Sequence, residues 1–187
     1  MSKETLPITH SHLGKFETIS GKIMDLQNPD PKHIDIEDIA TALSHIVRFG
    51  GHMRRPYTVG HHSILMSKLI PKEYALHALL HDATEAYLGD VIKPLKNILA
   101  PLYEPLEQKW EIAIATAFGI EWTPEARECV KILDIELLQT EYKYYRHGVN
   151  SPVVHRIGVI YTEAIQGDDH RNTAACFTYL FNQLKVS

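Results

Sequence analysis

Apolar residues recur at three- and four-residue steps through residues 36–47, and this spacing constrains the fold more than any other feature. Residues spaced in this way share one face of a helix. Asp35 precedes the run as a helix N-cap, and Gly50-Gly51 follows it as a stop. The segment therefore predicts an amphipathic helix whose buried positions are Ile36, Ile39, Ala40, Leu43, Ile46 and Val47.

Similar helical segments follow along the chain, bounded by Pro, Gly and N-cap residues. Thr123-Pro124, for example, matches an N-cap followed by proline at the first helical position. We expect helices over 59–69, 71–88, about 102–118, 124–145 and 168–184, with Asp168 or Asp169 capping the last. Residues 91–101 are expected to form a proline-containing link, and residues 147–167 stay unassigned.

The expected fold class is all-α: a compact bundle of about six or more helices in one domain covering residues 1–187. Residues 1–34 carry turn formers and predict an irregular N-terminal segment, with a short strand or hairpin near Phe16–Asp25. The length of 187 residues suits a single hydrophobic core.

Composition excludes several classes of partner. A net charge of −4 offers no basic excess for a nucleic-acid backbone. No stretch approaches the roughly 20 apolar residues that span a bilayer, so we expect no membrane partner. Two distant cysteines, Cys129 and Cys176, do not make a disulfide scaffold, and a cytoplasmic location is the simpler interpretation.

The candidate chemistry centres on His81-Asp82 in the expected helix 71–88. His62 on the preceding helix and Asp134 on the helix 124–145 are natural further ligands. Two imidazoles and two carboxylates suit one divalent cation such as Co²⁺, Mn²⁺, Zn²⁺ or Ni²⁺, with Mg²⁺ also possible. Each residue taken singly is more often structural, but the ordered set with a helix for each is harder to dismiss.

Two further carboxylates accompany these ligands. Glu85 lies one helical turn after His81 and could orient or deprotonate a water molecule. Asp90 follows the helix and could do the same or hold a ligand histidine. His52 follows the Gly50-Gly51 pair and could contact a substrate.

The pattern resembles the HD-domain metal-dependent phosphohydrolases. YTVGHHS, residues 57–63, is similar to a family element in which the ligand histidine directly precedes serine, which selects His62 rather than His61. The string LLHDATEAYLGDVIKPLK, residues 79–96, is close to that of YfbR-like 5′-deoxynucleotidases and bacteriophage dATP triphosphohydrolases. RFGGH, residues 48–52, and ILDIELLQTE, ending at Glu141, complete a resemblance that spans residues 36–145.

This resemblance implies a role for each matching residue. His62, His81, Asp82 and Asp134 would bind the metal; Glu85 would activate the attacking water, and Asp90 is the motif's second acid. Substrate contacts would come from Arg48 and Lys96 at the phosphates and from Phe49 at the base or sugar, with Lys93 assisting. The resemblance also implies a homo-oligomer, either a dimer or a hexamer.

The implied activity is hydrolysis of a deoxynucleotide at its α-phosphorus. The first candidate is dATP, giving deoxyadenosine and triphosphate and so supporting phage DNA that contains 2-aminoadenine. The alternatives are a 5′-deoxynucleotidase acting on deoxynucleoside monophosphates and a helical binding module without turnover. Expected loop cations favour the longer phosphate tail: Arg48, Arg54, Arg55, Lys93 and Lys96. We expect the base pocket wall to lie at 49–51 and near Ile19–Ile23.

Overall fold

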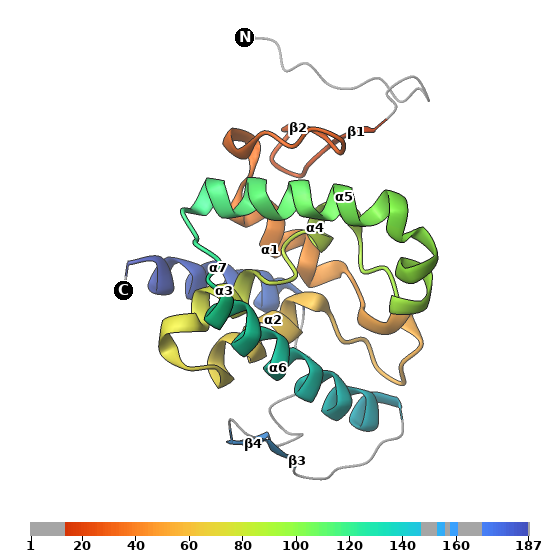
Figure 1. Cartoon of the computed structure of the whole chain (residues 1–187), viewed down its shortest axis with the longest axis vertical. Coiled ribbons are helices and arrows are strands. Elements are labelled where there is room, and N and C mark those ends of the chain that lie inside the picture. The colour runs from red at the N-terminus through yellow and green to blue at the C-terminus, as the bar shows by residue number, and fades with distance from the viewer. Residues whose placement is uncertain (1–13, 147–152, 156–157, 161–169, 187) are drawn as a thin grey trace.

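The computed structural model describes residues 14–146, 153–155, 158–160 and 170–186. Its fold is all-α apart from two short antiparallel hairpins, which confirms the expected class (Figure 1). The helices are α1 (Ile36–His45), α2 (Val59–Leu69), α3 (Ala75–Leu80), α4 (Glu85–Leu88), α5 (Lys93–Phe118), α6 (Pro124–Glu141) and α7 (His170–Lys185).

Side-chain caps set the starts of three predicted helices. The Asp35 carboxylate accepts the Glu37 N–H at the start of α1, and Thr58 accepts the His61 N–H at the start of α2. Thr123 caps α6 with Pro124 in its first turn, as the sequence predicted. A π-helical turn, Tyr142–Arg146, extends α6 as far as the predicted end near residue 145.

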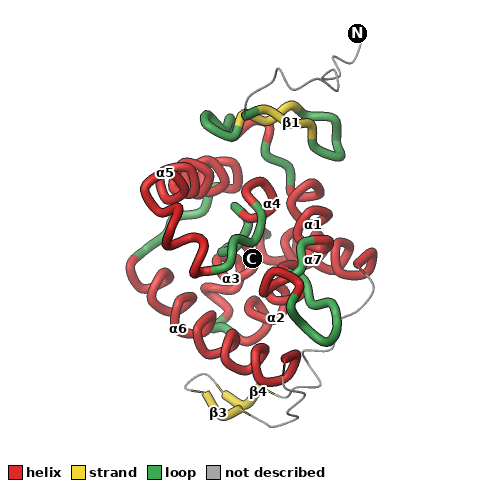
Figure 2. The backbone as a smooth tube through the Cα atoms, turned by 90° about the vertical axis from the view of Figure 1, so that its right-hand side faces the viewer, coloured by secondary structure: helices red, strands yellow, loops and turns green. Residues whose placement is uncertain are grey.

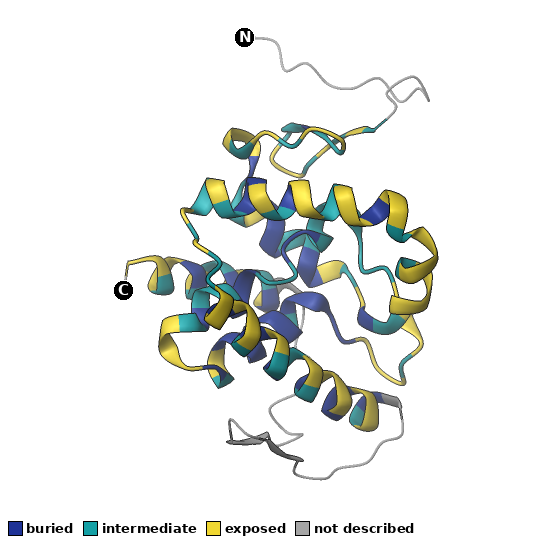
Figure 3. Ribbon diagram, in the orientation of Figure 1, coloured by how far each residue is buried: buried dark blue, intermediate teal, exposed yellow. Residues whose placement is uncertain are grey.

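The hydrophobic core joins segments from both ends of the chain. Its largest cluster includes Met24 before α1, Leu43 on α1, Trp110 on α5 and Phe177 on α7. In Figure 3 the buried residues gather on the inner faces of α1, α2 and α3, whereas α5 and α6 turn an exposed face outward. A second cluster packs α2 and α3 against α6 and includes Tyr57 and Leu137.

The expected single helix over 71–88 is wrong, because the structure divides it. A 3₁₀ turn at Lys72–Tyr74 precedes α3, and α4 begins only at Glu85. Between them the chain tightens into turns, with Ala83 N–H bonding the Leu80 carbonyl and Glu85 N–H bonding the Asp82 carbonyl. His81-Asp82 therefore lies at the junction of two short helices and not inside one.

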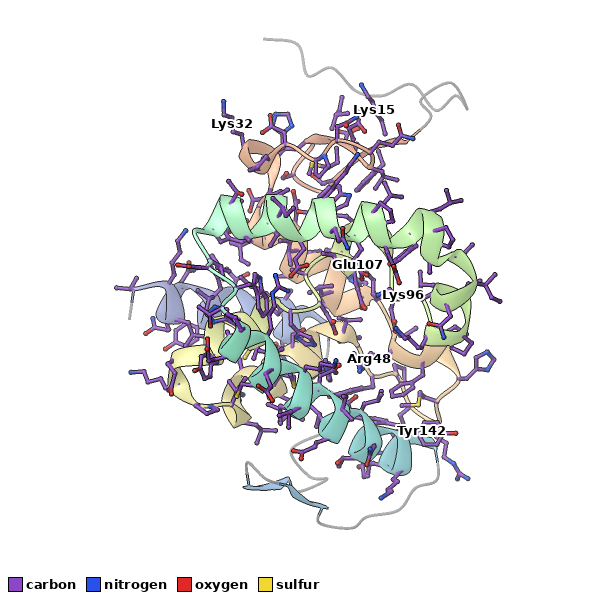
Figure 4. The ribbon with its side chains drawn as sticks, in the orientation of Figure 1. Lys15, Lys32, Arg48, Lys96, Glu107 and Tyr142 are labelled. Atoms are coloured by element: carbon purple, nitrogen blue, oxygen red, sulfur yellow. The ribbon has the colours of Figure 1, made fainter. Side chains whose placement is uncertain are left out.

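The expected link over 91–101 is also wrong, because α5 already begins at Lys93. Pro94 stands in the first turn, where its missing N–H is not needed. Pro101 and Pro105 lie inside the helix, where proline bends it. Lys96 and Glu107 would lie about 16 Å apart along a straight helix, yet they form an ion pair across this bend (Figures 1 and 4).

The two hairpins lie at opposite ends of the molecule (Figure 2). The predicted N-terminal hairpin consists of β1 (Lys15–Glu17) and β2 (Ile23–Asp25), and it is held near α5 by the Trp110 indole N–H bond to the Leu26 carbonyl. The unassigned region contains β3 (Val153–His155) and β4 (Gly158–Ile160). The expected caps Asp168 and Asp169 lie outside the described residues.

Among the helices of the described residues, none combines the length and the apolar character that a bilayer crossing requires.

Candidate metal centre

Four side chains from three parts of the fold converge near the middle of the molecule. His62 comes from α2, His81 and Asp82 from the turn after α3, and Asp134 from α6. His62 Nε2 lies 3.2 Å from His81 Nε2 and 3.1 Å from Asp134 Oδ1. His81 Nε2 lies 3.1 Å from Asp82 Oδ2. The structure thus brings together all four residues that the sequence selected.

The other nitrogen of each imidazole fixes its tautomer. His62 Nδ1 lies 2.7 Å from Glu141 Oε1, and His81 Nδ1 lies 2.7 Å from the Ala78 carbonyl oxygen. Both partners are acceptors, so each Nδ1 carries a proton and donates it. In a neutral imidazole, Nε2 then carries no proton and its lone pair is free to bind a cation. Two lone pairs therefore face one another at 3.2 Å, beside two carboxylates.

This arrangement fits a divalent cation. Two atoms bound to the same ion at about 2.0–2.1 Å lie about 2.8–3.4 Å apart at octahedral or tetrahedral angles. The three nearest spacings, 3.1, 3.1 and 3.2 Å, fall in this range. Ligand atoms of His62, His81 and Asp82 all lie within 4.8 Å of one another. A mixed nitrogen and oxygen set suits transition-metal ions, and the histidines' bonds to Glu141 and Ala78 orient them for binding.

Without a cation, a proton on His62 supplies the positive charge that faces Glu141 and Asp134. Burial is the largest influence on His62 and opposes its charging, as does Arg48. Glu141 and Asp134 outweigh both and raise the pKa of His62 to about 9. Burial likewise opposes the ionisation of Asp82, but His81, His62 and Arg48 hold its pKa well below the usual value. The site is thus built to stabilise positive charge.

Glu141 connects the centre to the surrounding fold. It is fully buried, and its Oε1 also accepts the Tyr57 hydroxyl at 2.7 Å. Arg48 Nε lies 3.2 Å from Glu141 Oε2, while Arg48 Nη1 donates to Asp82 Oδ2 at 3.3 Å. The sequence noted Glu141 only as part of a motif, although its position two helical turns after Asp134 was the available signal. No pattern pointed to Tyr57 as its partner.

A pocket of about 770 Å³ opens beside these ligands. Its wall includes eight of the residues that the sequence selected: Arg48, Phe49, Asp82, Glu85, Asp90, Lys93, Lys96 and Asp134. Four more residues also line it, the first two at the end of α6 and the last two in the π-helical turn that follows: Leu138, Gln139, Tyr142 and Lys143. No sequence pattern pointed to these four residues, because helical periodicity does not tell which face of a helix lines a pocket.

Some of the expected substrate contacts lie outside this pocket. His52 is exposed and does not line it, and the chain before it turns through Phe49, Gly50 and Gly51, all with positive φ. Arg54, Arg55 and residues 19–23 also lie outside its wall. His61 faces Thr58 and Thr173 and stacks on Tyr57, so His62 is the histidine that points to the centre.

The strained turn is held from the opposite wall. Phe49 adopts a φ of 59°, a left-handed conformation that is uncommon for a bulky residue. Its backbone N–H bonds the Asp90 side chain. Asp90 therefore positions the segment that carries Arg48 and Phe49. Burial, the main cause, together with Asp82, raises the pKa of Asp90 against the opposing effect of Arg48.

Glu85 is a further acid in the pocket wall, close to Asp82 and Asp90. Burial first, then the negative charges of Asp82 and Asp90, raise the pKa of Glu85 well above its usual value. Its Oε2 is buried and has no hydrogen-bond partner among the described residues. A carboxyl group in this state can accept or deliver a proton in the pocket.

Comparison with known proteins places the chain in a family. No family model matches the sequence. The uncharacterized protein YfdR of Escherichia coli K12 is 42% identical over 126 residues, which cover 67% of this chain and 69% of YfdR. The chain belongs to the YfdR family. An uncharacterized protein of Rhodobacter capsulatus is 37% identical to this chain over 111 residues, which cover 54% of this chain and 57% of that protein.

In this member of the YfdR family, the Tyr57 hydroxyl should stabilise the fold through Glu141. We expect Tyr57→Phe to lower the free energy of unfolding of the metal-free protein by about 1–3 kcal/mol, since the buried carboxylate loses a donor. Urea unfolding measures the change. The control is Tyr179→Phe, whose residue is 62% exposed and should change stability by less than about 0.5 kcal/mol. Equal stability of the two variants would refute the role of this hydrogen bond.

Proposed function

We propose that this protein is a divalent-metal-dependent phosphohydrolase of the HD-domain class that acts on a deoxynucleotide at its α-phosphorus. One observation carries the proposal. Ligand atoms of His62, His81 and Asp82 lie within 4.8 Å of one another at the wall of a pocket, and Asp134 Oδ1 lies 3.1 Å from His62 Nε2 and 4.0 Å from His81 Nε2. The other walls of that pocket carry cations and a buried acid. Such a site can bind a metal ion and a phosphate ester side by side.

His62, His81, Asp82 and Asp134 would hold the metal ion. When bound, a divalent ion there would polarise a phosphoryl oxygen and lower the pKa of a water molecule. Co²⁺, Mn²⁺, Zn²⁺, Ni²⁺ and Mg²⁺ are the candidates, because the site mixes imidazole and carboxylate ligands. The buried Glu141 would keep His62 in the tautomer that leaves Nε2 free to bind.

Cations of the chain would bind the phosphates. Arg48 is buried and held by Asp82 and Glu141, so its guanidinium is fixed at the edge of the pocket. Lys96 reaches the same pocket while paired with Glu107. Lys93 and Lys143 are exposed at the rim and form no ion pair within the described part of the chain.

Glu85 would move the proton of the attacking water. Burial and the charges of Asp82 and Asp90 raise its pKa, so the carboxyl holds a proton more readily than an ordinary glutamate, and positioned acid–base groups contribute about 10²–10⁴-fold to rate. Asp90 would act by fixing the Phe49 turn, which keeps Arg48 at the phosphate.

The favoured substrate is dATP, with deoxyadenosine and triphosphate as products. Four cations along one pocket suit a long phosphate tail, and two of them, Lys93 and Lys143, lie at its rim. Such an activity would support phage DNA that contains 2-aminoadenine. The alternative is a 5′-deoxynucleotidase, since a monophosphate needs only the centre and Arg48.

We also infer a homo-oligomer, a dimer or a hexamer, in the cytoplasm. The N-terminal half of α5 leaves apolar side chains exposed on the surface, which favours a contact between copies: Leu95, Ile98, Leu99 and Leu102. Both cysteines are free, which suits a reducing compartment.

A product assay tests the proposed activity. The protein is incubated with Co²⁺ or Mn²⁺ and each deoxynucleoside triphosphate and monophosphate, and the products are separated by chromatography. Triphosphate release from dATP is the expected result. Release of phosphate from monophosphates alone would select the alternative. No turnover of any nucleotide by protein that binds the metal would refute both.

Glu85→Gln tests the proton-transfer role. Glutamine has the shape of the protonated carboxyl, so the fold should persist, while kcat falls by about 10²–10⁴-fold. Metal affinity, measured by calorimetry, should stay the same because Glu85 is not a ligand. Glu125→Gln on the exposed start of α6 is the control and should retain full activity. A Glu85→Gln enzyme with unchanged kcat would exclude Glu85 from proton transfer.

Glu107→Gln tests the role of Lys96. Removing the carboxylate releases Lys96 from its ion pair, so the phosphates no longer compete with Glu107. We expect KM to fall several-fold with little change in kcat. The matched control is Glu111→Gln. Glu111 lies on the same helix as Glu107, and its substitution breaks an ion pair with Arg127 of α6, away from this pocket. An equal change in KM for both variants, or none for either, would remove Lys96 from substrate binding.

A further inference from the structure

The pocket has an apolar end that the metal chemistry does not use. Leu138 and Tyr142 line it and remain 39% and 41% exposed. They follow Asp134 at four-residue steps, so the three side chains share one side of α6 and its C-terminal extension. Exposed apolar side chains facing a polar pocket are available to a ligand rather than to the core.

This end lies at a defined distance from the metal centre. Tyr142 follows Asp134 by eight positions, about 12 Å along a helix. The centroids of the Tyr142 and Phe49 rings lie 6.1 Å apart, with an angle of 53° between the ring planes, and both residues line the pocket. Figure 4 shows Arg48 near the centre of the molecule and Tyr142 toward its lower edge. The cations and the apolar end therefore occupy different parts of one pocket.

Gln139 adds a polar edge to this apolar end. It is exposed and lines the pocket next to Leu138. Its side-chain amide forms no hydrogen bond in the portion of the chain that the structure describes. The amide therefore offers both a donor and an acceptor to a ligand.

We propose that Phe49, Leu138 and Tyr142 form the nucleobase subsite and that Gln139 selects adenine within it. The inference rests on the proposed nucleotide hydrolysis and holds for either length of phosphate tail. A base bound here would extend along α6 from a phosphate held at the metal centre and Arg48.

The apolar walls would bind any base by its flat face. Stacking of a base on an aromatic side chain contributes about 1–3 kcal/mol and depends little on which base it is. Tyr142 and Phe49 therefore supply affinity, and selectivity must come from a polar group at the base edge.

The Gln139 amide matches adenine at this edge. Adenine presents the N7 acceptor beside the N6 amino donor, which an amide pairs with two hydrogen bonds. Guanine presents two acceptors there, N7 and O6, so the amide carbonyl would face a lone pair. Pyrimidines have no N7. The amide thus favours adenine over guanine.

The test compares kcat/KM for dATP, dGTP and 7-deaza-dATP, or for the matching monophosphates if these are the substrates. In 7-deaza-dATP a C–H group replaces N7, so the wild type should use it less well than dATP. Gln139→Ala should reduce the preference for dATP over dGTP by about 10- to 100-fold. The same variant should no longer distinguish dATP from 7-deaza-dATP. Gln108→Ala, at an exposed position of α5 outside this pocket, is the control and should keep both preferences.

A second pair of variants tests the apolar walls. Tyr142→Ala should lower kcat/KM for all nucleotides by a similar factor, whereas Tyr142→Phe should retain most of the activity because its ring still stacks. Turnover with an unchanged base preference in Gln139→Ala would overturn the selection of adenine while leaving the hydrolase intact. The absence of turnover with every nucleotide in the wild type would instead overturn the proposed function and this inference with it.

Discussion

The buried Glu141 carboxylate is the contact on which the rest of the site depends. It accepts hydrogen bonds from His62 Nδ1 and the Tyr57 hydroxyl, and it faces the Arg48 guanidinium. Burial opposes its charge, but His62 and Arg48 hold the pKa of Glu141 below its usual value. One carboxylate from the end of α6 thereby fixes a histidine on α2 and the turn after α1. It also orients His62 Nε2 toward the other candidate ligands.

The carboxylates around His62 give the centre a strongly negative potential. Five carboxylates surround the centre, and among the described residues a single buried guanidinium, that of Arg48, opposes them. These carboxylates belong to Asp82, Glu85, Asp90, Asp134 and Glu141. Buried charges are tolerated when they are paired or bind a metal. A divalent cation would neutralise this cluster, and in the proposed chemistry Arg48 and Glu85 would act on the phosphate ester beside it.

The sequence predicted the parts of the structure that local chemistry determines. The caps Asp35 and Thr123 fix the starts of α1 and α6, and the sequence patterns predicted both. The predicted helix boundaries were wrong where contacts beyond the local pattern determine them. Examples are the break after Leu80 and the start of α5 at Lys93. The four candidate ligands could be selected from spacing and resemblance. Tyr57, Gln139 and Tyr142 could not be assigned to the site, because their roles depend on tertiary packing that no local pattern encodes.

We expect His62, His81, Asp82 and Asp134 to bind one divalent cation. Titration of the metal-free protein with Co²⁺, followed by visible absorption, measures this binding. One ion per chain should bind, with ligand-field bands that Asp134→Asn weakens or removes while the surface substitution His33→Ala leaves them unchanged. Asp134 is partly exposed, so this substitution should preserve the fold, which circular dichroism can verify. No bound cobalt in the wild type, or identical binding by Asp134→Asn, would show that these side chains do not form a metal site.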